Sequence, residues 1–195
     1  LMAVGAVPNT EDLGCAEVGV ALDNGYVAVD RVSRTSVNGI YAAGDCTGVL
    51  PLANVAAMQG RIAMWHALGE AVSPLNLKVV SSNVFTDPQI ASVGVTQAEV
   101  DSGIARAHGI KLPLATNARA KMQGVDAGFV KIFCRVSGTV VGAVVVAPNA
   151  SELIYSLALA VELGLNVDDL ATTFTVYPSL SGSIAEAARR LHQVD

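Results

Sequence analysis

The stretch "GIYAAGDCTG" at residues 39–48 places a single carboxylate, Asp45, directly after an apolar segment that ends at a glycine. We expect residues 38–45 to form a short buried strand, because the segment is apolar, contains an aromatic residue and is bounded by turn residues. The next segment, "LANVAAMQGRIAMWHALGEA" (52–71), is apolar around most of its helical circumference. It predicts a helix that is buried on more than one side.

Asp45 has two interpretations at this point. It is either a helix N-cap or turn residue, or a ligand-binding carboxylate at the C-terminal end of a strand. Ligands of open α/β sheets bind at the carboxyl ends of strands, and helix N-termini favour anionic groups. A carboxylate in this position can accept hydrogen bonds from the hydroxyl groups of a sugar-like ligand chain.

The composition excludes several classes of protein. Of the 195 residues 52% are hydrophobic and 15% are charged, so the chain is not disordered and can bury a core. A net charge of −5 without a basic block argues against a nucleic-acid partner. The longest apolar runs, such as "VVGAVVVA" (140–147), are too short to insert into a membrane.

The cysteines and the first residues indicate where the protein works. Cys15, Cys46 and Cys134 are dispersed without a CxxC or CxxxxC spacing, which predicts reduced cytoplasmic thiols and neither a metal site nor a redox pair. No signal peptide is recognisable in "LMAVGAVPNT". Leu1 lies within a strand-like run, so we expect the chain to be truncated at its N-terminus.

The rest of the sequence predicts a hairpin in the first half of the chain and an α+β unit in the second half. Asn24-Gly25 within residues 19–30 is a strong hairpin signal. Residues 72–78 read as a linker, and an α+β unit follows it. The elements expected there are a strand at 79–86, a capping box from Thr96 to Glu99, a hairpin at 128–148 and helices at 149–165 and 183–193. For the helix at 149–165, Asn149 or Ser151 is the candidate cap and Gly164 the candidate end.

Six segments in this order carry a resemblance to a known family. They are "GAVPNT" (5–10), "GVALDNGYVAVD" (19–30), "TSVNGIYAAGDCTG" (35–48), "LANVAAMQGR" (52–61), "FTDPQIASVGVT" (85–96) and "YPSLSGS" (177–183). Over essentially its whole length the chain resembles the C-terminal part of the FAD-dependent pyridine nucleotide–disulfide oxidoreductases. The fold that this implies is α/β plus α+β, namely the end of a Rossmann-like nucleotide-binding domain followed by an interface domain.

The resemblance implies roles for particular residues. "GIYAxGD" is the second FAD motif of the family, so Gly44 and Asp45 are expected to bind FAD, the aspartate at the ribityl chain. Main-chain N–H groups at the start of the next helix map to Leu52 and Ala53, near the flavin ring. Residues 1–75 correspond to the end of the nicotinamide domain and the return segment of the FAD domain. Residues 79–195 correspond to the dimerisation domain, which implies a homodimer.

Family members also contain an FAD-binding GxGxxG turn, a redox CxxxxC pair and a second nucleotide fold for NAD(P)H, none of which occurs in these 195 residues. "GAVPNT" resembles the end of the nicotinamide domain. We therefore expect these residues alone to be inactive.

The segment "YPSLSG" narrows the expected chemistry. Members that reduce disulfides carry a His-Pro-Thr-x-x-Glu type motif here, in which the histidine is the thiol acid/base and the glutamate orients it. This chain has Tyr177 at the histidine position and Gly182 at the glutamate position. A phenol with a pKa of about 10 cannot serve as a thiol base at neutral pH.

The resulting hypothesis is an oxidoreductase of the lipoamide dehydrogenase-like NAD(P)H:quinone reductase subgroup. Hydride passes from NAD(P)H to FAD and then to a quinone-type acceptor, without a dithiol relay. Tyr177 either lines the acceptor pocket or only packs against Pro178 at the interface. The alternatives are a soluble transhydrogenase or a dihydrolipoamide dehydrogenase of the same family, and a non-catalytic dimerisation module.

Overall fold

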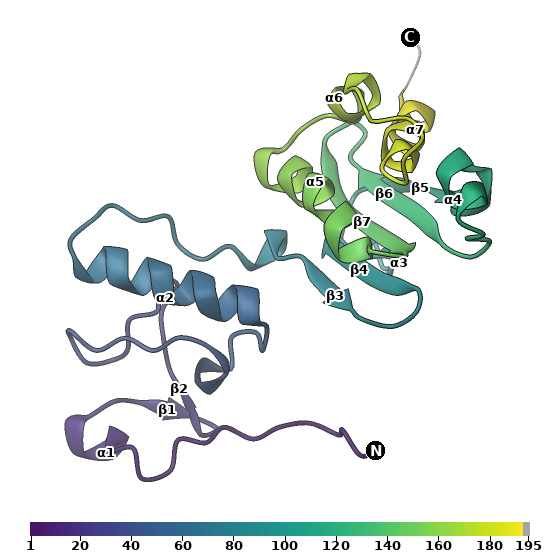
Figure 1. Ribbon diagram of the computed structural model, residues 1–195. Helices are drawn as coiled ribbons and strands as arrows, with labels where there is room; N and C mark the ends of the chain where they lie inside the picture. Colours follow the sequence, from purple (N-terminus) through teal and green to yellow (C-terminus); the bar gives the residue numbers. More distant parts are fainter. Residues whose placement is uncertain (193–195) are drawn as a thin grey trace. The chain divides into compact units, whose positions relative to one another are not determined.

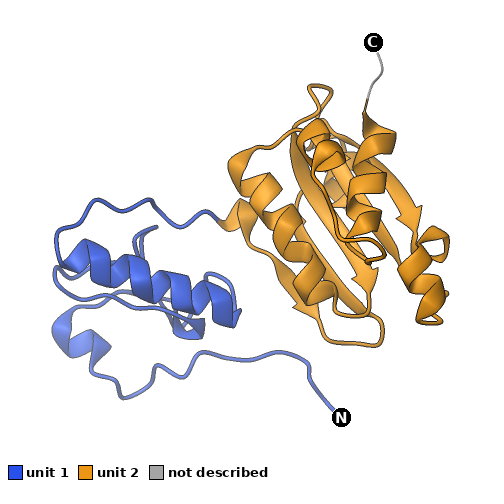
Figure 2. Ribbon diagram, turned by 45° about the horizontal axis from the view of Figure 1, so that its top comes forward, with its two compact units in different colours: residues 1–76 blue, residues 77–195 orange. Residues whose placement is uncertain are grey.

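The computed structural model describes residues 1–192 and divides the chain into two compact units (Figures 1 and 2). Unit 1 comprises residues 1–76 and unit 2 comprises residues 77–195. Residue 193, the last of the predicted C-terminal helix, lies outside the described residues. Within the described part of the chain, no helix has the length and apolar character needed to cross a bilayer.

Unit 1 contains little regular structure apart from one long helix. Its elements are α1 (Cys15–Val18), β1 (Leu22–Asp23), β2 (Tyr26–Val27), the 3-10 helix η1 (Asp45–Thr47) and α2 (Ala53–Ala67). The predicted hairpin is confirmed: β1 pairs with β2 in antiparallel register, and both turn residues, Asn24 and Gly25, have positive φ. Positive φ at both positions is the requirement of the tight hairpin turn for which Asn-Gly is preferred.

The expected strand at 38–45 is wrong. Tyr41 forms a single antiparallel bridge with Arg34, and the residues around it are irregular and mostly half-buried or exposed. A strand needs a neighbour that pairs with its N–H and C=O groups along its length. Within the described residues the backbone pairing of this segment is confined to Ile40–Ala42: the N–H of Thr35 donates to the carbonyl of Ile40, and the N–H of Ala42 donates to that of Ser33. The backbone turns back at Val37–Ile40 instead of extending.

Helix α2 is shorter than predicted and is buried on one side only. It ends at Ala67, because Gly69 with φ 83° leads the chain away from the helix. Its buried side chains are Val55, Gln59, Ile62 and Ala63. The other apolar side of α2 is exposed, so the expectation of burial on several sides is also wrong; the exposed residues are Met58, Met64, Trp65 and, at the C-cap, Leu68.

Unit 2 is built on a five-stranded antiparallel sheet. The strands are β3 (Ser82–Val84), β4 (Gln89–Gly94), β5 (His108–Pro113), β6 (Phe129–Cys134) and β7 (Val140–Ala147), in the spatial order β3-β4-β7-β6-β5. The hairpin predicted at 128–148 is confirmed as β6 and β7. Two strands, β4 and β5, were not predicted from the sequence, although β4 lies inside the sheet.

Helices cover one face of this sheet. Helix α5 (Ala150–Leu163) packs on β4 and β7, and α7 (Gly182–Leu191) packs on β5, β6 and α6 (Val167–Thr172), as Figure 1 shows. The remaining elements are η2 (Leu77–Val79), α3 (Gln97–Asp101), η3 (Leu114–Thr116) and α4 (Ala118–Met122). The core between sheet and helices includes Ala91, Leu112, Val130, Ile132, Val145, Leu157, Ala160 and Ala187.

Local signals set the helix ends in unit 2. Thr96 and Glu99 form the predicted capping box at the start of α3. Helix α5 has Asn149, one of the two candidate caps, at its N-cap and Gly164, the predicted end, at its C-cap, but the side chain of Asn149 makes no cap hydrogen bond.

Candidate functional site

The segment that carries Asp45 is a tight turn. Gly44 has φ 91° and ψ −160°, a conformation that side-chain-bearing residues rarely adopt. The N–H of Thr47 donates to the carbonyl of Gly44 at 3.0 Å, and the N–H of Gly48 donates to that of Asp45 at 3.1 Å. A Cβ on Gly48 would lie 2.8 Å from the ring of Tyr26, so this position also requires glycine.

The carboxylate of Asp45 lies exposed at the first position of this turn. Helix α2 has Leu52 as its N-cap and η1 has Gly44, so Asp45 is not a helix N-cap, but it is a turn residue, which was the other form of that interpretation. No residue among 1–192 donates a hydrogen bond to this carboxylate or pairs with it. An ionised carboxylate has acceptor capacity only, so Asp45 can receive hydroxyl donors from a ligand.

The start of α2 supplies the complementary group. Leu52 donates its N–H to the carbonyl of Leu50 at 2.8 Å and so is already paired, whereas the N–H of Ala53 has no acceptor among residues 1–192. The first turn of α2 contains no acidic residue, its N-cap Leu52 makes no side-chain cap hydrogen bond, and the Asn54 side chain accepts from the N–H of Val55 at 3.0 Å, not from that of Ala53. An unpaired N–H at the positive end of a 15-residue helix attracts an electron-rich acceptor.

This set of groups fits the expected cofactor. Asp45 offers an acceptor for hydroxyl groups, as the ribityl chain of FAD requires, and Ala53 offers a main-chain donor, as a flavin ring oxygen or nitrogen requires. Leu52 contributes only as the residue that begins the helix, because its own N–H is bonded.

Two polar residues that were not predicted hold the turn against α2. The amide oxygen of Gln59 accepts from the N–H of Gly44 at 2.8 Å, and its amide nitrogen donates to the hydroxyl of Thr47 at 3.2 Å. The Thr47 hydroxyl in turn donates to the carbonyl of Gly44 at 2.7 Å. The available sequence signal was a glutamine within an otherwise apolar stretch of helix.

A second polar pair, Tyr41 and His66, connects the residues just before Gly44 to helix α2. The phenol of Tyr41 lies 2.7 Å from Nδ1 of His66 in the last turn of α2, and the two rings meet edge to face. This pair joins the residues that precede Gly44 to the C-terminal end of α2.

Tyr177 lies in unit 2, in the exposed loop between α6 and α7. Its side chain is 85% exposed, and its phenol has no hydrogen-bond partner among the described residues. Phe174 and Val176 in the same loop are also exposed. The loop is anchored by Asn117, whose amide donates to the carbonyl of Ser179 at 3.0 Å and to the hydroxyl of Ser183 at 2.8 Å.

Gly182 is the first residue of α7, and no steric contact requires a glycine at this position. A Cβ at this position would meet no atom closer than 3.8 Å, and its φ is not positive. The nearest atoms would be Oγ of Ser179, Nδ2 of Asn117 and Oγ1 of Thr175. The position therefore has room for the Cβ of a glutamate, and the carboxylate is missing because of the residue type and not because of a steric clash.

A separate cavity of about 530 Å³ in unit 1 lies at the loop 28–38 and was not predicted. Asp30 on its wall is fully used within the loop: Oδ1 accepts from the N–H groups of Val32 and Arg34 at 3.0 Å, and Oδ2 pairs with the Arg34 guanidinium at 3.2 Å. Partial burial raises the pKa of Asp30, but the N–H groups of Arg34 and Val32 and the Arg34 charge outweigh it and lower the pKa. These partners explain Asp30 as a loop-forming residue.

Comparison with known families gives two matches that together cover most of the chain. Residues 80–188 match the model for the pyridine nucleotide-disulphide oxidoreductase dimerisation domain. Residues 1–60 match the model described as pyridine nucleotide-disulphide oxidoreductase.

Curated relatives and solved structures agree with these matches. The chain is 64% identical over 193 residues to an NAD(P)H dehydrogenase (quinone) of Mycobacterium tuberculosis, covering 98% of this chain and 39% of that protein. It is 38% identical over 194 residues to a dihydrolipoyl dehydrogenase of Staphylococcus aureus, covering 97% of this chain and 41% of the relative. The chain thus spans about two fifths of the curated relatives that it matches.

The crystal structure of LpdA from Mycobacterium tuberculosis superposes with a TM-score of 0.95 at 62% identity, over 99% of this chain and 42% of that one. The HOCl-induced flavoprotein disulfide reductase RclA from Escherichia coli gives a TM-score of 0.89 at 26% identity, over 97% of this chain and 44% of that one.

Proposed function

Because the chain belongs to the pyridine nucleotide-disulphide oxidoreductase family, we propose that it is part of a flavoprotein that oxidises NAD(P)H and reduces a quinone-type acceptor without a dithiol relay. The observation that carries this proposal is the motif at 177–182. An exposed, unpaired phenol at Tyr177 stands where disulfide-reducing members have an imidazole, and Gly182 lacks the carboxylate that would orient one. The NAD(P)H dehydrogenase (quinone) relative at 64% identity supports the same acceptor class.

The residues of unit 1 hold the cofactor. Asp45 accepts hydrogen bonds from the hydroxyl groups of the ribityl chain, and the N–H of Ala53 donates to an acceptor on the flavin ring. Gly44 contributes the backbone conformation that exposes Asp45, and Leu52 begins the helix. When bound beside these residues, FAD would supply the redox chemistry: it would take up a hydride from NAD(P)H and pass two electrons and a proton on to a quinone, whose second proton would come from solvent.

Tyr177 acts on the acceptor. Its phenol O–H donates a hydrogen bond to a quinone carbonyl oxygen, which orients the acceptor and polarises it toward reduction. A phenol O–H can donate to a carbonyl oxygen, whereas the imidazole of the disulfide-reducing members serves as the thiol acid/base.

The second subunit is another copy of this chain. Tyr155, Leu159 and Leu163 recur at four-residue spacing on α5 and are exposed, so they form one apolar stripe along the helix. We assign this stripe to the homodimer interface, because it lies within the residues that match the dimerisation-domain model. A partner that covers the stripe removes these side chains from water.

The protein is assigned to the cytoplasm. Cys15, Cys46 and Cys134 are free thiols in the described structure. Free, dispersed thiols are typical of a reducing compartment.

The function is tested with the full-length protein that contains these residues. The purified protein should be yellow with bound FAD, and NAD(P)H oxidation should accelerate on addition of quinones but not of lipoamide. Tyr177→Phe should raise KM for the quinone while leaving FAD bound. Rapid turnover of lipoamide would overturn the proposal, and so would a colourless dimer from the complete gene.

The role of the 177–182 motif has its own test. The double variant Tyr177→His, Gly182→Glu restores the two side-chain types of the disulfide-reducing motif, and the space at Gly182 accepts a Cβ. If the motif sets the acceptor, this variant loses quinone turnover relative to the parent protein. Unchanged quinone kinetics would contradict a role for Tyr177.

The dimer is tested by Leu159→Glu, which places a charge in the middle of the apolar stripe and should yield a monomer in light scattering. Val136→Glu, at an exposed site in the turn between β6 and β7, is the matched control and should leave the dimer intact. A dimeric Leu159→Glu protein would show that the interface lies elsewhere.

A further inference from the structure

Gln59 is an unusual residue for the inner side of a helix. Its side chain is polar but only 1% exposed, between the buried residues Val55 and Ile62 of α2. Burial of an amide is costly unless its donors and acceptors are satisfied. Here the oxygen accepts from the N–H of Gly44 and the nitrogen donates to the hydroxyl of Thr47, so both ends of the amide are used.

Three hydrogen bonds join Gly44, Thr47 and Gln59 into a closed ring, and Asp45 lies between Gly44 and Thr47. Gly44 and Thr47 flank Asp45 and Cys46, and Thr47 closes the ring by donating to the carbonyl of Gly44. Because the Thr47 hydroxyl donates its proton to Gly44, its oxygen is free to accept, and it accepts from the Gln59 amide nitrogen at 3.2 Å and more weakly from the N–H of Val49 at 3.5 Å. The N–H of Gly44 needs an acceptor, which the amide oxygen provides. A carboxamide is therefore the side chain that matches both positions.

This arrangement determines the position from which the Asp45 side chain projects. That carboxylate makes no hydrogen bond of its own within residues 1–192, so within the described residues its placement depends on the backbone of the turn, which fixes the Cα–Cβ bond, and on its side-chain rotamer. The other hydrogen bonds of the turn stay within residues 43–49: Thr47 donates to Gly44, Gly48 donates to Asp45, the Cys46 thiol donates to Ala43, and the N–H of Val49 donates to the Thr47 hydroxyl. Gln59 connects the turn to α2, and the same helix carries the unpaired N–H of Ala53 at its start.

We propose that Gln59 is a positioning residue for the flavin cofactor. Its buried amide locks the Gly44–Thr47 turn onto α2 and so aligns the Asp45 carboxylate with the hydroxyl groups of the ribityl chain. This inference rests on the proposed function, because it assumes that Asp45 binds FAD. Gln59 itself lies buried beneath the turn and acts through Asp45.

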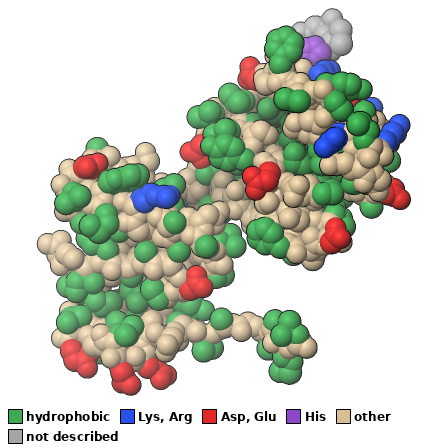
Figure 3. Space-filling model, viewed as in Figure 1, with side chains coloured by type: hydrophobic (Ala, Val, Ile, Leu, Met, Phe, Trp, Pro, Cys, Tyr) green, Lys and Arg blue, Asp and Glu red, His purple; other side chains and the backbone are tan. Residues whose placement is uncertain are grey.

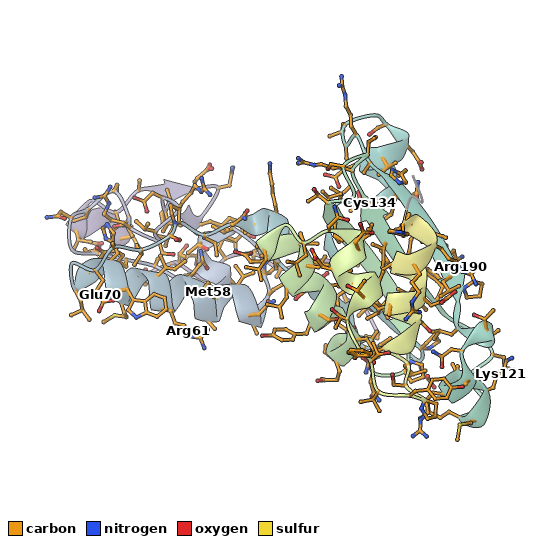
Figure 4. The ribbon with its side chains drawn as sticks, turned by 90° about the horizontal axis from the view of Figure 1, so that it is seen from above. Met58, Arg61, Glu70, Lys121, Cys134 and Arg190 are labelled. Atoms are coloured by element: carbon orange, nitrogen blue, oxygen red, sulfur yellow. The ribbon has the colours of Figure 1, made fainter. Side chains whose placement is uncertain are left out.

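The test measures the affinity of the full-length apoprotein for FAD, followed by quenching of FAD fluorescence. Gln59→Leu preserves the approximate size but removes both hydrogen bonds, and Asp45→Asn removes the charge of the binding group. Each single variant should weaken FAD binding by about tenfold or more, as expected for the loss of a hydrogen bond that involves a charged group. Arg61→Leu is the matched control, because Arg61 projects outward from the same helix (Figure 4). It should bind FAD like the parent.

A double-mutant cycle separates positioning from general destabilisation. If Gln59 acts through Asp45, the substitution Gln59→Leu weakens FAD binding in the parent protein but changes it less than about twofold in the Asp45→Asn background. If Gln59 only supports the fold, both losses appear in full in the double variant, and the positioning role is overturned.

A second variant covers the case in which Gln59→Leu does not fold. Gln59→Glu keeps an acceptor for Gly44 at every pH but can donate to Thr47 only when its carboxyl is protonated. Its FAD affinity should therefore fall as pH rises, more steeply than that of the parent; parallel pH profiles would overturn the role of Gln59. A parent apoprotein that binds no FAD would instead overturn the proposed function, so the two failures are distinguishable.

Discussion

The two units of this chain differ in how large a hydrophobic core they form. Both expose large apolar side chains, but unit 2 also buries an extensive core. Unit 2 places them between a five-stranded sheet and two helices, where many side chains are fully buried. Unit 1 exposes much of its apolar surface, and Figure 3 shows hydrophobic side chains at the surface in this part of the molecule. The large exposed residues of unit 1 are Leu1, Met2, Val4, Val7, Leu13, Val18, Leu22, Met58, Met64, Trp65 and Leu68.

The difference shows what holds each unit together. Unit 2 has a continuous core and paired strands of up to eight residues, which together provide burial and backbone hydrogen bonds. Unit 1 has strands of two residues and depends on turns and on side-chain hydrogen bonds such as those of Gln59. Apolar surface left in water contributes nothing to folding, so unit 1 should be the less stable unit.

The largest expected effect is a separation of the two unfolding transitions of the 195-residue chain. Trp65 is the chain's single tryptophan and lies in unit 1, so its fluorescence reports that unit alone. We expect its transition at a lower urea concentration than the loss of hydrogen-exchange protection in β6 and β7. Coincident transitions would show that the two units unfold as one and would contradict the comparison.

The next effect is the loss of unfolding free energy when a buried aliphatic side chain is shortened to alanine in each unit. Leu157→Ala, at a fully buried position of unit 2, should cost about 2–5 kcal/mol of unfolding free energy. Ile62→Ala in α2 should cost unit 1 less, because a small core with exposed neighbours can collapse around the cavity. Val136→Ala at an exposed turn serves as the control and should change stability by about 0.5 kcal/mol or less. Equal costs for Leu157→Ala and Ile62→Ala, each read by hydrogen exchange in its own unit, would argue against this difference.

A smaller effect should appear in thiol reactivity. Cys134, labelled in Figure 4, is buried on β6. Burial raises the pKa of its thiol and so favours the neutral form, which is unreactive. Cys15 and Cys46 in unit 1 are partly exposed. Iodoacetamide at mildly alkaline pH should therefore modify Cys15 and Cys46 well before Cys134, as read by peptide mass spectrometry. In urea all three should react, and early labelling of Cys134 in the folded protein would refute the expected protection.

The smallest effect is the pH dependence of one helix start. The N–H and hydroxyl of Thr96 both donate to the Glu99 carboxylate at 2.8 Å, and these bonds lower the pKa of Glu99. Because the folded pKa lies below the unfolded one, the stabilisation is present above the unfolded pKa and is lost as pH falls through the folded pKa. Carboxyl NMR titration should give a depressed pKa for Glu99. In Thr96→Ala the pKa should rise only part of the way to its ordinary value, because the variant loses the hydroxyl donor but keeps the main-chain N–H, which is the larger cause of the shift. An unchanged pKa in that variant would exclude the Thr96 hydroxyl as a cause.

Features set by neighbouring residues were the ones predictable from sequence. The Asn24-Gly25 turn, the Thr96–Glu99 capping box and the end of α5 at Gly164 follow from the backbone preferences of a few adjacent residues. The strand expected at 38–45 failed, because strand formation depends on a pairing partner that sequence pattern does not identify. Strand β4 was missed for the related reason that its pairing with β3 and β7 joins distant segments.

The candidate site divides in the same way. Asp45, Ala53 and Tyr177 were identified from motifs, and their structural surroundings leave the first two with unpaired groups and the third exposed. Leu52 was identified by the same motif, but its N–H is already bonded to Leu50. Gln59 was not identified, because its amide meets Gly44 and Thr47 only once α2 lies against the turn.

The sequence by itself determined the order of the family motifs, the turns and caps, and the replacement of an imidazole and a carboxylate by Tyr177 and Gly182. These depend on residue type and on spacing along the chain. Only the tertiary structure decided which apolar residues are buried, which main-chain groups remain unpaired and which buried amide supports Asp45. The physical reason is that burial and hydrogen-bond satisfaction are set by contacts between segments far apart in sequence.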